Sequence, residues 1–292
     1  SAMRYGLGDG VLCQINGTVA IAGTTVVVDN PGTKWLAKGM RLACLTERTT
    51  PTINTGHTNL GVGSVTDGTT FELAAALATT EMTDNYFLAP SLARVSGATT
   101  TYVPQGLMAI CDDGTNCATF QGLARASYPE IKGILDNGGS VYRNPSKNMV
   151  ELAMARAMII QGKTPSTIIG HPGIMVKWRQ ALESKENFPT QGVSQEMGKL
   201  PLRYGGKSIT IIEDRWCLDR DIFIVKTGDI DRLVWKEFAW DKEDGAVLRR
   251  AGDGTLSYSA DYFGWETLGC QDPRGMIRVG YINNDLKEIH SW

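Results

Sequence analysis

Three histidines are the residues best suited to acid–base chemistry, because imidazole titrates near neutral pH. They are His57, His171 and His290, and none stands beside a serine or cysteine in a nucleophile motif. Neither a glycine-flanked serine elbow nor a phosphate-binding loop occurs. His57 follows Gly56 in a polar turn, which predicts a solvated side chain. His171 precedes Pro172 at a predicted strand-to-helix turn, where it would cap the helix or pack.

Six cysteines offer nucleophilic or metal-binding chemistry: Cys13, Cys44, Cys111, Cys117, Cys217 and Cys270. A disulfide framework is typical of short secreted domains, and this chain is long with scattered cysteines. Cys111 and Cys117 form the only close pair, and their spacing matches no common zinc motif. We therefore expect buried free thiols in a reducing cytoplasm.

Loops rich in aspartate and glycine could hold calcium, which prefers several oxygen ligands. None has the spacing of a calcium-loop motif, and tight turns explain these residues better. The loops are 8–10, 112–116, 241–245 and 252–254. An acidic cluster is formed by Asp241, Glu243 and Asp244. A solvent-exposed turn explains this cluster as well as a catalytic acid–base pair does. The sequence thus predicts no catalytic, cofactor-binding or metal-binding residue, and no cofactor.

The overall composition excludes several classes of protein. The 292 residues are 42% hydrophobic and carry a formal net charge of −2, which argues against a dedicated nucleic-acid binder but not against a protein that encloses DNA. No apolar run approaches the length of a membrane span, and no signal peptide is visible. The chain begins with Ser1 and Ala2, which fits either foreign residues or a natural start farther upstream.

The elements that must position these residues change character along the chain. Up to about residue 90, short β-rich runs alternate with turn signals, which predicts a small sandwich or barrel. We expect its strands at 19–28, 40–45, 60–65 and 69–73, with a helical turn at 74–78. The expected core consists of Val26, Val28, Leu36, Met40, Leu42, Val62, Val65, Phe71 and Leu73.

From about residue 103, helical and strand patterns mix. A buried helix is predicted at 149–160, with Asn144 and Pro145 as its start and Gly162 as its stop. A second helix is predicted at 173–185. Strands are expected at 167–170, 208–212, 222–225, 232–239, 246–250, 258–265 and 276–282. Strands grouped at both ends with helices between them indicate an α+β fold.

One segment resembles a known family. Gly106-Leu107, the turn Asp112-Asp113-Gly114-Thr115-Asn116, then Gln121-Gly122 and Arg125 resemble a recurrent segment of tailed-phage major capsid proteins of the Hong Kong 97 type. The glycine-rich residues 8–12 resemble the turn after that family's spine helix. The two predicted helices, with 167–172 and 202–225, resemble its axial domain. Residues 228–235 and the later strands resemble its peripheral domain.

The resemblance implies a domain layout. Residues 1–12 and 228–292 would belong to the peripheral domain and 125–227 to the axial domain, joined through a return segment at 93–124. Residues 13–92 would be an inserted β module with its own core, projecting as a decoration or an added contact. The N-terminal arm, the extended loop and the spine helix of the family have no counterpart here. We therefore expect a chain that folds as a monomer or small oligomer without closing into shells. It should expose an apolar strip on the peripheral sheet where the spine helix would lie.

The resemblance also implies a function without catalysis. Copies would associate into hexamers and pentamers that enclose double-stranded DNA, in a virion assembled in the host cytoplasm. Scaffolding, portal and decoration proteins would be partners, with no specific nucleic-acid sequence and no membrane. Two alternatives stay open: an encapsulin-like nanocompartment shell, and a hydrolase or carbohydrate-binding β protein, which a deep pocket with convergent carboxylates would favour.

Overall fold

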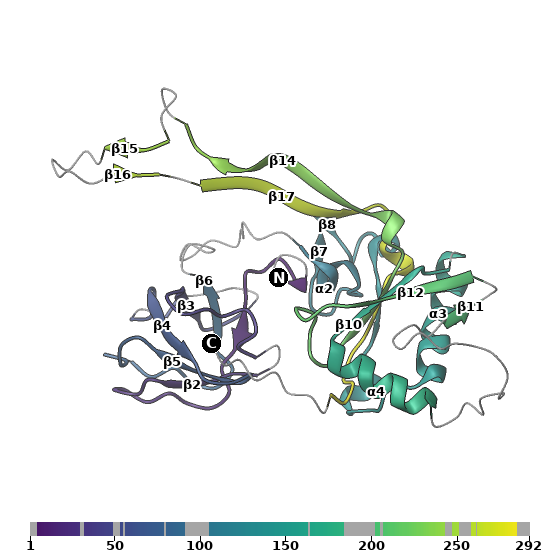
Figure 1. Ribbon diagram of the computed structural model, residues 1–292, viewed down its shortest axis with the longest axis horizontal. Coiled ribbons are helices and arrows are strands. Elements are labelled where there is room, and N and C mark those ends of the chain that lie inside the picture. Colours follow the sequence, from purple (N-terminus) through teal and green to yellow (C-terminus); the bar gives the residue numbers. More distant parts are fainter. Residues whose placement is uncertain are drawn as a thin grey trace, which may run out of the picture.

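The protein has a mixed α+β fold with few helices and several sheets (Figure 1). The computed structural model describes residues 5–29, 32–48, 53–54, 56–78, 80–90, 105–162, 164–183, 202–204, 207–242, 247–250, 258–260 and 262–284. In this part of the chain, no helix is both long and apolar enough to cross a membrane.

The first sheet is a six-stranded antiparallel barrel. Its strands follow the order β1-β6-β3-β4-β5-β2. They are β1 (Cys13–Gln14), β2 (Thr25–Val27), β3 (Arg41–Leu45), β4 (Leu60–Val65), β5 (Thr70–Leu73) and β6 (Phe87–Pro90). A bridge between Ile15 and Val28, with Asn16 N donating to Val27 O at 2.9 Å, joins the two outer strands. This bridge closes the barrel and leaves no open edge there.

The expected barrel core is largely confirmed. Seven of the nine expected residues are buried, and Met40 and Val65 are partly buried against the same cluster. The alternation that predicted these strands places their apolar side chains on one face. The predicted helical turn at 74–78 is wrong, since bends and irregular chain follow β5.

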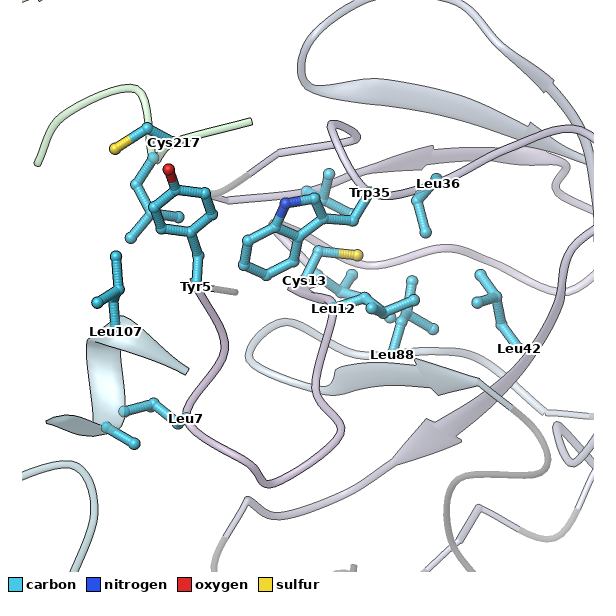
Figure 2. Close-up of a cluster of buried hydrophobic side chains, with 14 of the residues drawn as sticks. Tyr5, Leu7, Leu12, Cys13, Trp35, Leu36, Leu42, Leu88, Leu107 and Cys217 are labelled. Atoms are coloured by element: carbon cyan, nitrogen blue, oxygen red, sulfur yellow. The ribbon is translucent and has the colours of Figure 1, made fainter. Parts of the chain in front are cut away.

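The barrel core is not confined to the barrel, so the expectation of a separate core is wrong. Tyr5, Leu107 and Cys217 belong to the same buried cluster as barrel residues such as Trp35 and Leu88 (Figure 2). The sequence could not show this continuity, because its residues lie far apart along the chain. The boundaries of the inserted module stay a prediction.

The second sheet is mixed and carries the two long helices. Its strand order is β11-β12-β10-β13-β18-β9, where β10 pairs in parallel with β12, and β18 with β9. These strands are β9 (Ile134–Asp136), β10 (Thr167–Gly170), β11 (Leu202–Tyr204), β12 (Lys207–Glu213), β13 (Ile222–Val225) and β18 (Ile277–Val279). The predicted sheet at 125–227 therefore recruits one strand, β18, from the C-terminal part of the chain.

Both predicted helices are confirmed as α3 (Lys147–Gln161) and α4 (Pro172–Glu183). They share a buried cluster with the mixed sheet, in which Met154 and Trp178 lie with Ile224. The predicted start of α3 is wrong by two residues, because Ser146, and not Asn144, is the N-cap and accepts a hydrogen bond from Met149 N at 3.3 Å. Gly162 ends α3 with a φ of 68°, as predicted.

A long two-stranded ribbon leaves the mixed sheet and extends beyond it (Figure 1). It consists of β14 (Ile230–Trp240) and β17 (Tyr262–Cys270). A small hairpin, β7 (Thr119–Phe120) and β8 (Leu123–Ala124), lies near its root. The remaining short elements are α2 (Leu107–Ile110), η1 (Pro129–Ile131), η2 (Gly138–Ser140), η3 (Thr227–Asp229), η4 (Pro273–Gly275), β15 (Arg249–Arg250) and β16 (Tyr258–Ser259).

Candidate functional site

The solvated position predicted for His57 is wrong. Its side chain is buried, and Nε2 lies 2.9 Å from both the carbonyl and the hydroxyl oxygen of Thr80. The carbonyl of His57 accepts a hydrogen bond from Cys44 N at 2.9 Å, which folds this turn back onto β3. Its neighbours in sequence are polar, so only the tertiary fold reveals this burial.

His171 caps a helix, as its position before Pro172 predicted. Its buried ring accepts a hydrogen bond at Nδ1 from Gly173 N, at 3.2 Å. Its Nε2 lies 3.9 Å from Asp219 Oδ1. His171 therefore holds the first turn of α4 in place, and His290 lies outside the described residues.

All six cysteines are free and buried, which confirms the prediction of unpaired thiols. Burial raises the pKa of Cys44 to about 12 and that of Cys270 to about 11. It also raises the pKa of the others: Cys13, Cys111, Cys117 and Cys217. A nucleophilic cysteine needs a lowered pKa, which favours the thiolate. These cysteines have raised pKa values, so they serve as core residues.

Two aspartate–glycine loops are tight turns, as expected. Asp9 Oδ1 accepts a hydrogen bond from Val11 N at 3.1 Å, and Asp113 Oδ1 accepts one from Thr115 N at 2.9 Å. Such side-chain bonds to the backbone two residues ahead define Asx turns. Within the described residues, no three histidine, cysteine or acidic side chains gather as metal ligands would. Glu243, Asp244 and the loop 252–254 lie outside those residues.

The Asp–Asp–Gly–Thr–Asn turn that carries the family resemblance is built around buried Asp112. Its Oδ2 accepts hydrogen bonds from Gly114 N and Cys117 N, both at 2.9 Å. Arg125, also buried, lies with Nη1 3.5 Å from the same oxygen. The motif is therefore a structural unit in which one carboxylate organises the turn and pairs with one guanidinium.

Arg125 ties three segments together. Nη1 donates to Cys117 O at 3.0 Å, Nε donates to Ile131 O at 3.1 Å, and Nη2 donates to Ala109 O. Its guanidinium also lies 4.9 Å from the centre of the Phe120 ring. The three carbonyls belong to α2, the loop before β7 and η1, and Phe120 belongs to β7, so Arg125 fixes the support near the ribbon root.

The ribbon is exposed and carries many large apolar side chains. All of β14 beyond Ile230 is exposed. Large exposed hydrophobic side chains on the two strands are Leu233, Val234, Trp235, Phe238, Trp240, Tyr262 and Trp265. We call this set the aromatic ribbon. Scattered single apolar residues are normal on a surface, but a contiguous patch marks an interaction site.

Cross-strand pairing gathers the aromatic side chains near the far end of the ribbon. Trp240 pairs with Tyr262 in register, and their ring centres lie 5.1 Å apart. Phe238 stacks on Tyr262 at 6.0 Å. Lys236 Nζ lies 3.9 Å from the centre of the Phe263 ring. Such pairs stabilise the ribbon without hiding its surface.

Trp235 stands out because the pairing register shifts around it. Val234 pairs with Glu266 and Lys236 pairs with Trp265, so Trp235 is an extra residue in a β-bulge. Bulges redirect a side chain away from the regular alternation of a strand. Trp235 is 94% exposed, an unusual position for the largest apolar side chain.

An apolar pocket of about 320 Å³ lies at the ribbon root. Ile230 and Leu268 of the ribbon, Ile169 and Ile212 of the mixed sheet, and Leu107 line it. The pocket opens on the sheet face opposite α3 and α4, because Ile168 and Ile224, which alternate with Ile169 and Val225, belong to the helix cluster. Asp214 also lines it.

A second exposed apolar group lies on α3. Leu152, Met158, Ile159 and Ile160 are all exposed, and Ile159 is 84% so. The sequence predicted that this helix is largely buried, and that is wrong for its outer face. Apolar residues on every face of a helix indicate either burial or a partner, and here one face has no cover within the described chain.

Comparison with known proteins gives remote structural likenesses. The chain is similar to the capsid asymmetric unit of cyanophage A-1(L), with 11% identity and a TM-score of 0.45 over 63% of this chain and 62% of that one. It is also similar to the holo-SrpI encapsulin complex of Synechococcus elongatus PCC 7942, with 12% identity and a TM-score of 0.32 over 55% and 56% of the chains. A third likeness is to a virus-like particle from Pyrococcus furiosus, with 13% identity and a TM-score of 0.27 over 45% and 49%.

The chain thus spans less than two thirds of the length of each of these structures. No protein family and no curated protein matches the sequence.

Proposed function

We propose that this chain is a structural subunit of an icosahedral phage capsid, in which copies associate into hexamers and pentamers around double-stranded DNA. The observation that carries the proposal is the aromatic ribbon. An isolated two-stranded ribbon is only marginally stable in water, yet β14 extends over 11 residues with its side chains exposed. Such a ribbon gains stability when its apolar surface is covered by a partner.

The turn at Asp112 and Arg125 supports the same proposal. Its residues resemble the recurrent segment of Hong Kong 97-type capsid proteins, and the structure uses them to fix the support near the ribbon root. Repeated subunits need rigid contact surfaces, because small errors in angle add up around a closed shell. The proposal includes a non-catalytic role and a location in the virion. It also includes the division into axial and peripheral domains, and scaffolding, portal or decoration proteins as partners.

Sedimentation velocity tests the proposal on the chain as it stands. We expect oligomers that grow with protein concentration. A variant with Phe238→Ser, Trp240→Ser and Tyr262→Ser should lose them while keeping its circular dichroism spectrum, because all three side chains are exposed. A matched control changes the exposed Ile21 and Val141, which lie outside the ribbon strands, to serine. A wild-type chain that stays monomeric would contradict the proposal.

The contents of purified particles distinguish a phage capsid from an encapsulin-like shell. Purified assemblies that contain double-stranded DNA support a phage capsid, whereas assemblies that lack a genome and hold a protein cargo favour an encapsulin-like shell.

A further inference from the structure

We propose that Trp235 of one copy inserts into the apolar pocket at the ribbon root of a second copy. This inference rests on the proposed self-association and assigns its anchor residue and its receiving site. The knob is the indole that the β-bulge turns outward, and the hole is the pocket of about 320 Å³ lined by Leu107, Ile169, Ile212 and Leu268.

The geometry of the ribbon makes this contact intermolecular. Ile230 lines the pocket at the root, and Trp235 lies five residues farther along the same strand. At about 3.3 Å per residue, the ribbon carries Trp235 roughly 16 Å away from its own pocket. Because strand pairing with β17 holds β14 extended, the indole cannot fold back into that pocket.

Charge and hydrogen-bonding groups are complementary across the contact. Among the described residues that line the pocket, Asp214 alone is acidic or basic, and its carboxylate accepts hydrogen bonds from Tyr5 Oη at 2.7 Å and Trp216 N at 2.9 Å. The knob brings the indole N–H, which is a donor only, and the next residue in the sequence, Lys236, carries a positive charge. Lys236 is half-exposed, and its ammonium lies 3.8 Å from Asp241 Oδ1 and 3.9 Å from the centre of the Phe263 ring.

The contact joins two different surfaces, so it is heterologous. A head-to-tail contact of this kind repeats from copy to copy and forms a ring when its rotation closes. Tryptophan in a desolvated pocket is also the residue type most often found to dominate interface energies. One knob and one hole on each copy therefore suffice to build a ring of subunits.

The test uses two surface variants of the full chain, each measured by sedimentation velocity. Trp235→Ala removes the knob, and Ile212→Arg blocks the hole at a residue that is 41% exposed. Each should weaken self-association by about 30-fold or more, the effect of losing one interface anchor. Tyr128→Ala is the matched control, since Tyr128 is an exposed aromatic residue outside the ribbon strands and the pocket lining, and it should change the association constant by less than about 3-fold, as expected for a residue outside the interface.

Mixing the two variants gives the decisive result. The Ile212→Arg chain keeps its knob and the Trp235→Ala chain keeps its hole, so the mixture should form one-to-one dimers that grow no further. Circular dichroism checks that both variants are folded. Self-association of Trp235→Ala at wild-type strength, or a mixture that stays monomeric, would overturn the inference and leave the proposed function standing. A wild-type chain that never associates would instead overturn the proposed function, and the inference with it.

Discussion

Arg125 and Asp112 form a buried pair in which Nη1 lies 3.5 Å from Oδ2, and each side chain is at most 1% exposed. The carboxylate also accepts backbone hydrogen bonds from Gly114 and Cys117, and the guanidinium donates to three carbonyls. The pair is thus fully integrated into the backbone rather than placed at a surface. Removing one partner of such a buried ion pair destabilises the protein, because the other charge is left buried without compensation.

Replacing Arg125 by methionine should therefore lower the free energy of unfolding by about 3–5 kcal/mol, because it leaves Asp112 charged and unpaired inside the protein. Urea denaturation followed by fluorescence measures the change. Arg232→Met is the control, since Arg232 pairs with Glu266 on the exposed ribbon and should cost less than about 1 kcal/mol. Equal effects of the two substitutions would show that the buried pair has no special role.

Lys34 should anchor the barrel to the rest of the molecule. Its buried ammonium donates to Cys217 O at 2.6 Å and pairs with Asp219. Lys34→Met keeps the aliphatic stem but leaves that carbonyl unsatisfied, which should cost about 1–3 kcal/mol. Lys38→Met, at an exposed position of the same segment, should stay within about 0.5 kcal/mol of wild type. Hydrogen exchange that is unchanged across the barrel in Lys34→Met would argue against the anchor.

The buried thiols predict a loss of stability in alkali. The pKa of Cys44 is raised to about 12, above the usual value of about 8.5 for an unfolded chain. Between these two pKa values, the Cys44 thiol is deprotonated in the unfolded state but protonated in the folded state. This thiol therefore costs no stability below about pH 8.5, and the free energy of unfolding falls as the pH rises above it. The slope from one such thiol reaches about 1.4 kcal/mol per pH unit.

Denaturation at pH 8, 9.5 and 10.5 should show that Cys44→Ala is destabilised at the lowest pH and has a flatter pH dependence than wild type. Identical slopes for the two chains would mean that this thiol does not contribute to the alkaline loss. A thiol reagent at pH 8 should also react slowly with the folded chain and rapidly after unfolding, because all six thiols are buried.

Much of the local structure follows from the sequence, because strand and helix periodicities report which side chains face a core. The strand at 60–65 and the two long helices lie where the apolar pattern places them. The Asp–Gly turns also follow from the backbone preferences of their residues. Burial of His57 and Lys34 does not, because each is polar and its partner comes from a distant part of the chain.

The candidate surface could be predicted only in part. An exposed apolar strip was expected on the later strands, and six of the seven tryptophans lie in the second half of the chain, which pointed to a core or an interface. The exposure of Trp235 depends on a register shift between β14 and β17, and no local pattern in the sequence encodes that shift. The pocket at the ribbon root likewise joins residues from six separate segments.

Electron microscopy of the purified protein tests the proposed function most directly. The aromatic ribbon and the pocket at its root predict rings of five or six copies, without closed shells, at high protein concentration. The Trp235→Ala chain, imaged under the same conditions, should give far fewer of them. Wild-type particles that remain single subunits at every concentration would contradict a role as a self-associating capsid subunit.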